Sequence, residues 1–236
     1  MFFKAFKKYE TEIAGRPFVV EVGKMAQLAG GSCLVRYGET NVLCTATMAA
    51  KPREGVDFFP LSVDYEEKLY SVGKIPGSFQ RREGRASEKA TLASRVIDRP
   101  IRPLFPKDMR NDVGVVATVM SVDPDCQPEI TAMLGVSIAI SISEIPWDGP
   151  IAGVVVGLVD GQYVINPTLE QRAKSDMYVT VASTADLVAM IEAGANEVSN
   201  DDMFDGIMFA HKENQRLVEF INQIKAECGK PKVDFP

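Results

Sequence analysis

Short runs of apolar and β-branched residues, separated by glycine or polar breaks, fill the first third of the chain. Four of these runs predict β-strands at residues 18–22, 33–37, 42–48 and 58–65. Gly30 and Gly31 mark one turn, and residues 38–41 (GETN) mark another that closes a hairpin. Residues 51–55 (KPREG) are expected to form a loop. The pattern therefore predicts a β-rich first part of the fold.

The regular pattern is lost between residues 72 and 86, where glycine, proline and charged residues replace the apolar ones. This segment is predicted to be a mobile loop. Ser87 follows it as the N-cap of a helix that runs to about Ile97, since a serine oxygen can accept from the first free backbone amides. Pro100 and Pro103 are expected to end this helix because proline lacks the amide hydrogen that a helix interior needs.

Helices and strands are interleaved through the rest of the chain. Residues 113–122 predict a buried strand, and residues 129–143 predict a buried helix by their length, although their isoleucines also permit a strand. Pro146, Gly149 and Pro150 mark a break. Further elements are three strands at 151–159, 162–165 and 177–182, a hairpin turn at 160–161, and a final helix over about 203–228 capped from residue 199. The pattern predicts an α/β or α+β fold in two halves, 1–145 and 151–228.

The composition is that of a globular protein, with 46% hydrophobic and 25% charged residues among 236. The four cysteines lie far apart, which disfavours a zinc site and favours reduced core thiols. The single histidine, His211, lies in a helical-looking stretch and is expected at the surface or at a helix cap, which disfavours a catalytic triad and a multi-histidine metal site. No segment resembles a signal peptide or a membrane span, so a cytoplasmic protein without membrane contact is expected.

Charge is concentrated in one window. Residues 74–110 hold ten lysines and arginines and four acids, a net charge of +6 in a chain whose formal net charge is −6. Seven of the ten are arginines, whose planar guanidinium suits phosphate. The window therefore predicts an anion-binding surface, with a solvated face of ordinary ion pairs as the alternative.

Two motifs within this window can bind a nucleic acid. Phe79 stands beside Arg81 and Arg82 in the loop, an arrangement that can stack a base while it contacts phosphates; local packing of Phe79 is the alternative. Arg99 and Arg102 lie in a proline-stiffened segment, which favours a fixed phosphate clamp. The alternative for this second pair is a structural one, in which the arginines cap the helix or pair with a neighbouring aspartate.

Evidence for other chemistry is weak. Glu170 and Asp176 are six residues apart and are candidate Mg²⁺ ligands, because hard cations prefer oxygen. Two unsupported carboxylates do not define a metal site. The chain contains no P-loop, dinucleotide fingerprint or H-E-x-x-H motif, so triphosphate hydrolysis, redox chemistry and zinc hydrolysis lose their main support.

Several motifs spread along the chain resemble those of a known family, the first RNase PH-like core domain of bacterial polynucleotide phosphorylase. The matching stretches are residues 21–26 (EVGKMA), 38–43 (GETNVL), 57–61 (DFFPL), 73–79 (GKIPGSF), 81–85 (RREGR), 98–105 (DRPIRPLF) and 229–232 (GKPK). The glycine-flanked loop together with the DRPIRPLF string is far more specific than a lone glycine motif.

This resemblance implies an RNase PH-like fold, with mixed sheets, flanking helices and two halves. Enzymes of the family are ring-shaped homotrimers that degrade single-stranded RNA from its 3′ end with inorganic phosphate and release nucleoside diphosphates. Each subunit has two such core domains, a helical linker and RNA-binding modules. The resemblance places the phosphate site and the Mg²⁺-binding aspartates in the second core domain, and it suggests partners from RNA-degradation complexes.

The resemblance also suggests roles for individual residues. Phe79, Arg81 and Arg82 match the loop that narrows the central channel and grips RNA, and Gln80 stands where the family commonly has a second phenylalanine. Arg85, Arg99 and Arg102 match positions near the RNA path. Glu170 and Asp176 match acids of the second domain and are read as a vestige, so no catalytic or metal-binding residue is assigned here.

The expected organisation is one core domain over residues 1–228, followed by the start of a linker to a helical domain at 229–236. Three functions stay open. The chain can be the non-catalytic, RNA-channel and trimer-forming part of a phosphorolytic exoribonuclease, or an RNA-binding and oligomerisation module without catalysis. The third, a complete small RNase PH-like enzyme, is disfavoured because a serine-rich phosphate-binding turn is missing.

Overall fold

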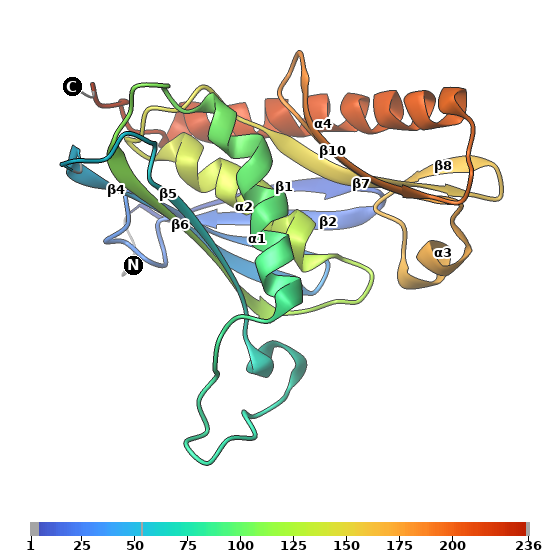
Figure 1. The fold of residues 1–236 in the computed structure, drawn as a ribbon, viewed down its shortest axis with the longest axis horizontal. Coiled ribbons are helices and arrows are strands. Elements are labelled where there is room, and N and C mark those ends of the chain that lie inside the picture. The colour runs from blue at the N-terminus through green and yellow to red at the C-terminus, as the bar shows by residue number, and fades with distance from the viewer. Residues whose placement is uncertain (1–4, 53, 235–236) are drawn as a thin grey trace.

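The computed structural model describes residues 5–52 and 54–234 and arranges them as two β-sheets with helices packed against them (Figure 1). In chain order the elements are β1 (Lys7–Ile13), β2 (Arg16–Val22), β3 (Gly31–Tyr37), β4 (Thr40–Pro52), β5 (Leu61–Glu67), η1 (Leu69–Val72), α1 (Glu88–Ile101), η2 (Arg102–Leu104), β6 (Asn111–Ser121), α2 (Pro128–Ile142), β7 (Ala152–Val159), β8 (Gln162–Ile165), α3 (Leu169–Lys174), β9 (Met177–Ser183), β10 (Val188–Ala195) and α4 (Asn200–Cys228). The first half of the chain supplies one sheet and the second half supplies the other.

The larger sheet has six strands in the order β1-β2-β3-β4-β6-β5. Neighbouring strands are antiparallel except for β5, which runs parallel to β6 with Leu61 opposite Val113. Parallel neighbours require a crossover connection, because a tight hairpin cannot join them. In this chain that connection contains η1, residues 73–87, α1 and η2, so the predicted loop is part of the crossover between β5 and β6.

The smaller sheet has four strands in the order β10-β9-β7-β8, and all its pairs are antiparallel. The β7–β8 hairpin turns at Asp160 and Gly161, which both adopt positive φ as the tight hairpin turns require. The larger sheet is mixed, and helices flank both sheets. The predicted α/β (α+β) class, with mixed sheets, flanking helices and two halves, is therefore confirmed, although the smaller sheet is antiparallel throughout.

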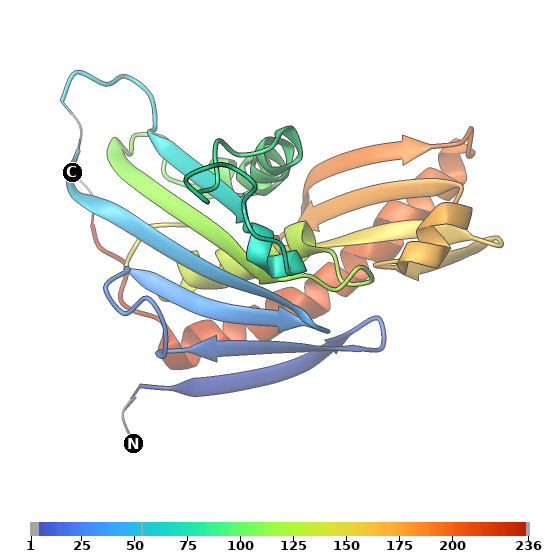
Figure 2. The same ribbon diagram turned by 90° about the horizontal axis from the view of Figure 1, so that it is seen from below.

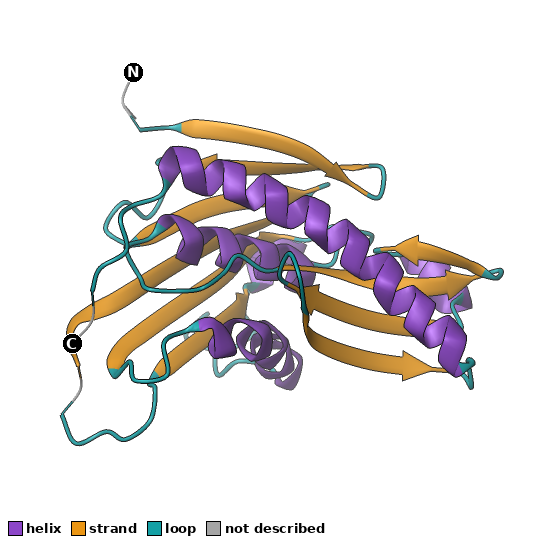
Figure 3. Cartoon of the chain, turned by 90° about the horizontal axis from the view of Figure 1, so that it is seen from above, coloured by secondary structure: helices purple, strands orange, loops and turns teal. Residues whose placement is uncertain are grey.

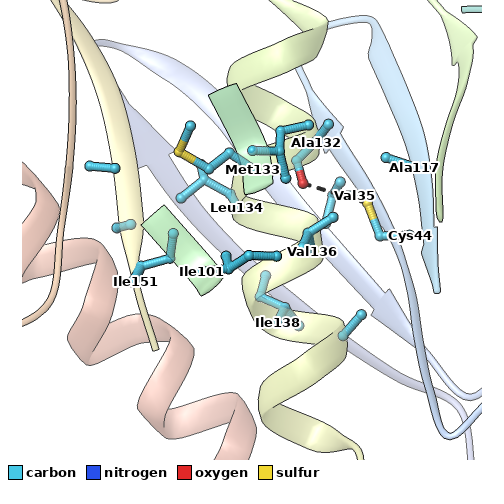
Figure 4. Packing of buried hydrophobic residues seen from close by; sticks show 14 of the residues in the cluster. Val35, Cys44, Ile101, Ala117, Ala132, Met133, Leu134, Val136, Ile138 and Ile151 are labelled. Carbon is cyan, nitrogen blue, oxygen red and sulfur yellow. Dashed lines mark hydrogen bonds between the residues drawn. The ribbon is translucent and has the colours of Figure 1, made fainter. Parts of the chain in front are cut away.

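Helix α2 forms the centre of the core. All its residues except Glu129 are buried, which is expected for a helix that is apolar on every side. Gly135 allows the close approach to the larger sheet, since a Cβ there would lie 2.5 Å from the Cys44 sulfur. Figure 4 shows this packing, in which Cys44 contacts the Ala132 carbonyl. All four cysteines are free and three are buried, as expected for core thiols.

Helix α4 joins the two halves. It runs along the molecule and crosses both sheets (Figure 3). Asn214 donates from its side-chain amide to the Val181 carbonyl of β9 at 2.9 Å, whereas Phe220 packs edge-on against Phe18 of β2 at 6.3 Å between ring centroids. Ser199 caps the helix as predicted. One continuous helix therefore fixes the smaller sheet relative to the larger one.

Most predicted elements are present, but strands β1 and β10, helix α3 and the short helices η1 and η2 were missed. Strand β1 contains mainly lysine and glutamate around its apolar positions, and strand β10 is rich in alanine and glycine. Both lie at sheet edges, where pairing with one neighbour allows polar or small residues that a central strand excludes. Helix α3 has only six residues and depends on the Thr168 capping box.

Two expectations about individual residues are wrong. Helix α1 continues through Pro100 to Ile101, because Ile97 and Ile101 are completely buried and their packing outweighs the missing hydrogen bond. His211 is buried on the inward face of α4, close in the helix to Asn214, and not at the surface or at a cap. The sheet beneath α4 sets the environment of His211, and the neighbouring sequence does not indicate that tertiary contact.

Two sequence expectations extend beyond the described part of the chain. Residues 235–236 of the proposed linker start and residues 1–4 of the proposed core domain lie outside the described residues. Among the described residues, no helix is both long and apolar enough to cross a membrane.

Candidate nucleic-acid interface

The segment from residue 73 to residue 87 leaves the body of the molecule as a long loop between η1 and α1. Figure 1 shows it extending away from both sheets, and Figure 2 looks onto the molecule from that end. Every residue from 77 to 89 is exposed. Ser87 ends the loop by accepting from the Ala90 backbone amide at 3.1 Å, as predicted for the N-cap of α1. The predicted loop and its boundary are thus confirmed.

The tip of this loop has a turn stabilised by its own hydrogen bonds. The Arg81 amide donates to the Ser78 carbonyl at 2.9 Å, and the Ser78 hydroxyl donates to the Arg82 carbonyl at 3.3 Å. Arg81 has a φ of 53°, a left-handed conformation that is unfavourable for most residues other than glycine and asparagine. The turn presents Phe79 at its apex, and the Phe79 ring is fully exposed.

The cations of the loop have no carboxylate partner in the part of the chain that the structure describes. Within the described residues, no acid lies within ion-pair distance of Lys74, Arg81, Arg82 or Arg85, and all four side chains are exposed. An exposed aromatic ring beside unpaired guanidinium groups can stack on a base and contact phosphates at the same time. The alternative of local packing for Phe79 has no support in this geometry.

Glu83 is the one acid in the loop, and it points back toward the body. Its Oε1 accepts from the Leu69 backbone amide at 2.7 Å, and its Oε2 lies 3.6 Å from the Lys68 ammonium. Lys68 also pairs with Glu66 at 2.5 Å, and that hydrogen bond is the main reason why the pKa of Lys68 is raised. In the sequence Glu83 is distinguished only by its charge, and no local pattern indicates its tertiary contact with η1.

Arg102 is engaged within the protein. Its guanidinium binds both carboxylate oxygens of Asp98, at 3.0 Å from Nε and 2.9 Å from a terminal nitrogen, and also donates to the Phe59 and Leu61 carbonyls. This is the structural alternative considered for the clamp. Arg99 is more exposed and lies 3.8 Å from Glu192 of β10. The structure thus does not bring Arg99 and Arg102 together with the arginines at the loop tip.

Glu170 and Asp176 make separate contacts in the structure. Glu170 lies on α3 and accepts from Lys174 at 2.7 Å, which lowers the pKa of the Glu170 carboxyl. Asp176 follows the helix, and its backbone pairs with Leu158 and Asn196. In the described ranges, 5–52 and 54–234, no three histidine, cysteine or acidic side chains gather as a potential metal site.

Comparison with protein families gives two adjacent matches. Residues 14–146 match the model of the 3′ exoribonuclease family, domain 1, and residues 149–213 match the model of the 3′ exoribonuclease family, domain 2. The loop, α1 and strands β2 to β6 of the larger sheet fall in the first match, whereas the smaller sheet and part of α4 fall in the second.

Curated relatives carry a consistent name. A polyribonucleotide nucleotidyltransferase of Ruminiclostridium cellulolyticum is 63% identical over 98% of this chain and 33% of its own length. Proteins of the same name from Heliobacterium modesticaldum and Clostridioides difficile are 61% and 60% identical over 97% and 96% of this chain. The chain spans about a third of the length of the curated relatives it matches.

Proposed function

Because this chain belongs to the 3′ exoribonuclease family, we propose that it is the RNA-gripping part of a polyribonucleotide nucleotidyltransferase. Such an enzyme degrades single-stranded RNA from the 3′ end, uses inorganic phosphate as co-substrate and releases nucleoside diphosphates. Mg²⁺ and phosphate bind, on this proposal, in a second core domain of the complete enzyme. The single observation that carries the proposal is the exposed loop, with Phe79 and three arginines that have no carboxylate partner among the described residues.

The chemistry of the loop fits single-stranded RNA better than a folded polyanion. Aromatic stacking needs a base whose face is accessible, and a single strand offers that face where a duplex does not. The guanidinium groups of Arg81, Arg82 and Arg85 then contact the phosphates on either side of the stacked base. In a homotrimeric ring, three copies of the loop would line one channel, and a strand passing along it would meet each copy. Proteins of an RNA-degradation complex are further candidate partners.

Arg99 and Arg102 are not assigned to the primary RNA contact in this proposal. The Arg102 guanidinium already binds Asp98 and two backbone carbonyls, so its use on a phosphate would require breaking internal contacts. Arg99 has one long ion pair, with Glu192, and remains the better candidate of the two for RNA. We therefore place the primary RNA contact at Phe79, Arg81, Arg82 and Arg85.

Fluorescence anisotropy with a labelled oligoadenylate tests the arginines. We expect the Arg81→Asn/Arg82→Gln pair to weaken binding and to reduce the slope of log affinity against log salt, by about 0.7 for each phosphate that the variant no longer neutralises. Asparagine is chosen at position 81 because it tolerates the left-handed backbone. The matched control is Lys51→Gln/Lys212→Gln, which removes two exposed cations elsewhere and should leave the affinity close to that of the wild type.

The same titration tests the aromatic contact. Phe79→Ala should lower the affinity by the value of one stacked base, about 1–3 kcal/mol, without changing the melting temperature, because the exposed ring buries nothing in the free protein. Leu28→Ala is the control, since Leu28 is equally exposed but lies in the β2–β3 connection. Unchanged RNA affinity in both the Phe79 variant and the arginine pair would remove the loop from the RNA site.

A further inference from the structure

The long loop has few ties to the body of the molecule. Between the end of η1 and the start of α1, its residues are exposed apart from the half-buried Pro76, and they contribute no side chain to the hydrophobic core of the described chain. Beneath its returning limb lies a cavity of about 350 Å³, lined by residues of β5, the loop and the start of α1, among them Tyr65, Glu67, Glu83 and Arg85. Apolar packing therefore does not determine where the tip sits.

Glu83 supplies the contact that apolar packing does not. It lies in the returning limb, two residues after Arg81, and its carboxylate reaches the first residue of η1, where the Leu69 amide donates to it at 2.7 Å. A backbone amide at the start of a helix has no partner within the helix, so an acceptor there satisfies an otherwise free donor. The Lys68 ammonium lies 3.6 Å away and lends the contact a favourable charge.

We propose that Glu83 is the positioning residue of the RNA-binding loop: its hydrogen bond to the Leu69 amide fixes the returning limb on η1 and so sets where Phe79, Arg81 and Arg82 meet the RNA. The internal bonds of the tip, from Ser78 to Arg81 and Arg82, keep the turn itself in shape. With the turn rigid and the limb anchored, the tip is ordered before RNA arrives. Less ordering entropy is then lost on binding. This role of Glu83 in RNA binding rests on the proposed function.

The negative charge of Glu83 weakens RNA binding, whereas its hydrogen bond to Leu69 is proposed to strengthen it. The test must separate these two effects. A carboxylate two residues from Arg81 repels phosphate, so its removal alone raises RNA affinity at low salt. Glu83→Gln and Glu83→Ala remove the same charge, but only glutamine keeps an oxygen that can accept from the Leu69 amide. The comparison between these two variants therefore isolates the anchoring hydrogen bond.

Amide hydrogen exchange at Leu69 measures the anchor without RNA. We expect this amide to be protected in the wild type and in Glu83→Gln, and to exchange about three- to tenfold faster in Glu83→Ala, as for the loss of one hydrogen bond. In the oligoadenylate titration, Glu83→Ala should bind about three- to tenfold more weakly than Glu83→Gln. Glu219→Ala, an exposed acid on α4, serves as the control and should change neither quantity.

The outcomes distinguish a failure of the anchoring role from a failure of the proposed function. Equal Leu69 exchange in all variants, or equal RNA affinity of Glu83→Ala and Glu83→Gln, would overturn the anchoring role. If the wild-type chain does not bind oligoadenylate at all, the proposed function of the loop fails, whereas the exchange experiment still reports on the anchor. Faster amide exchange at Leu69 together with weaker RNA binding in Glu83→Ala supports both the anchoring role and the proposed function.

Discussion

Arg82 and Arg102 are the same residue type within one basic segment, yet their surroundings differ. Arg82 is exposed on the loop, and no carboxylate of the described residues lies within ion-pair distance of it. Arg102 has a carboxylate on one side and two backbone carbonyls on the other. At the scale of single residues, the acceptors within reach decide whether an arginine is available to a ligand.

The structural role of Arg102 predicts a loss of stability when it is replaced by lysine. An ammonium cannot bind Asp98 in a bidentate manner and reach the Phe59 and Leu61 carbonyls as well, because it is a point charge rather than a planar fork. Arg102→Lys should lower the free energy of unfolding by about 1 kcal/mol, measured by urea denaturation. RNA affinity should stay unchanged.

Arg95→Lys provides the comparison, since Arg95 is an exposed side chain on the same helix α1. It should change the free energy of unfolding by less than about 0.5 kcal/mol. The opposite pattern, in which Arg102→Lys weakens RNA binding at unchanged stability, would establish the phosphate clamp and reject the structural role.

At the scale of elements, α2 shows how close packing restricts sequence. Gly135 faces β3 and β4, and a methyl group there would lie 2.5 Å from the Cys44 sulfur and 2.8 Å from a Val35 methyl carbon. Gly135→Ala gains helix propensity of about 1 kcal/mol but overpacks a filled core, which costs about 1–3 kcal/mol. We expect a net loss of stability, seen as a lower midpoint in urea denaturation.

Gly194→Ala on β10 tests whether the destabilisation at Gly135 comes from packing. In the part of the chain that the structure describes, no atom of a non-neighbouring residue lies within 4 Å of the position that a Cβ would take at Gly194. This variant should therefore leave the urea midpoint close to that of the wild type. A stabilised Gly135→Ala variant would mean that the sheet moves away from α2 at little cost, and the close packing would then not constrain this position.

At the scale of the whole molecule, the proposal assigns RNA binding and catalysis to different parts of the enzyme. The chain alone, supplied with Mg²⁺, inorganic phosphate and labelled poly(A), should bind the RNA but release no nucleoside diphosphate. The reason is that phosphorolysis needs a held phosphate and neutralised charge at the same point, whereas the acid Glu170 is paired with Lys174. A complete polyribonucleotide nucleotidyltransferase is the positive control.

Robust diphosphate release by the chain alone would support the reading as a complete small RNase PH-like enzyme. RNA binding without any release, even when the chain is combined with a second core domain, would favour the binding and oligomerisation module instead. Each result assigns RNA binding and catalysis differently to the parts of such an enzyme.

Local physics explains which features the sequence could specify by itself. Ser87 and Ser199 cap their helices because a cap is made within four residues, and the glycine-rich segment at 73–87 forms a loop because its residues cannot bury enough apolar surface. The nearly uncharged, largely apolar stretch of α2 likewise favoured burial. The loop residues Phe79, Arg81 and Arg82 were therefore visible as candidates from composition and spacing.

Tertiary structure alone decided the contacts between distant segments. Strands β1 and β10 pair at sheet edges although their sequences give weak strand signals. Helix α1 continues past Pro100 because Ile97 and Ile101 are buried. The bonds of Arg102 to Phe59 and Leu61 span about forty residues, and the bond of Glu83 to Leu69 ties the loop to η1. Hydrogen bonds depend on distance in space, so which arginines are engaged by internal acceptors is settled only when the chain has folded.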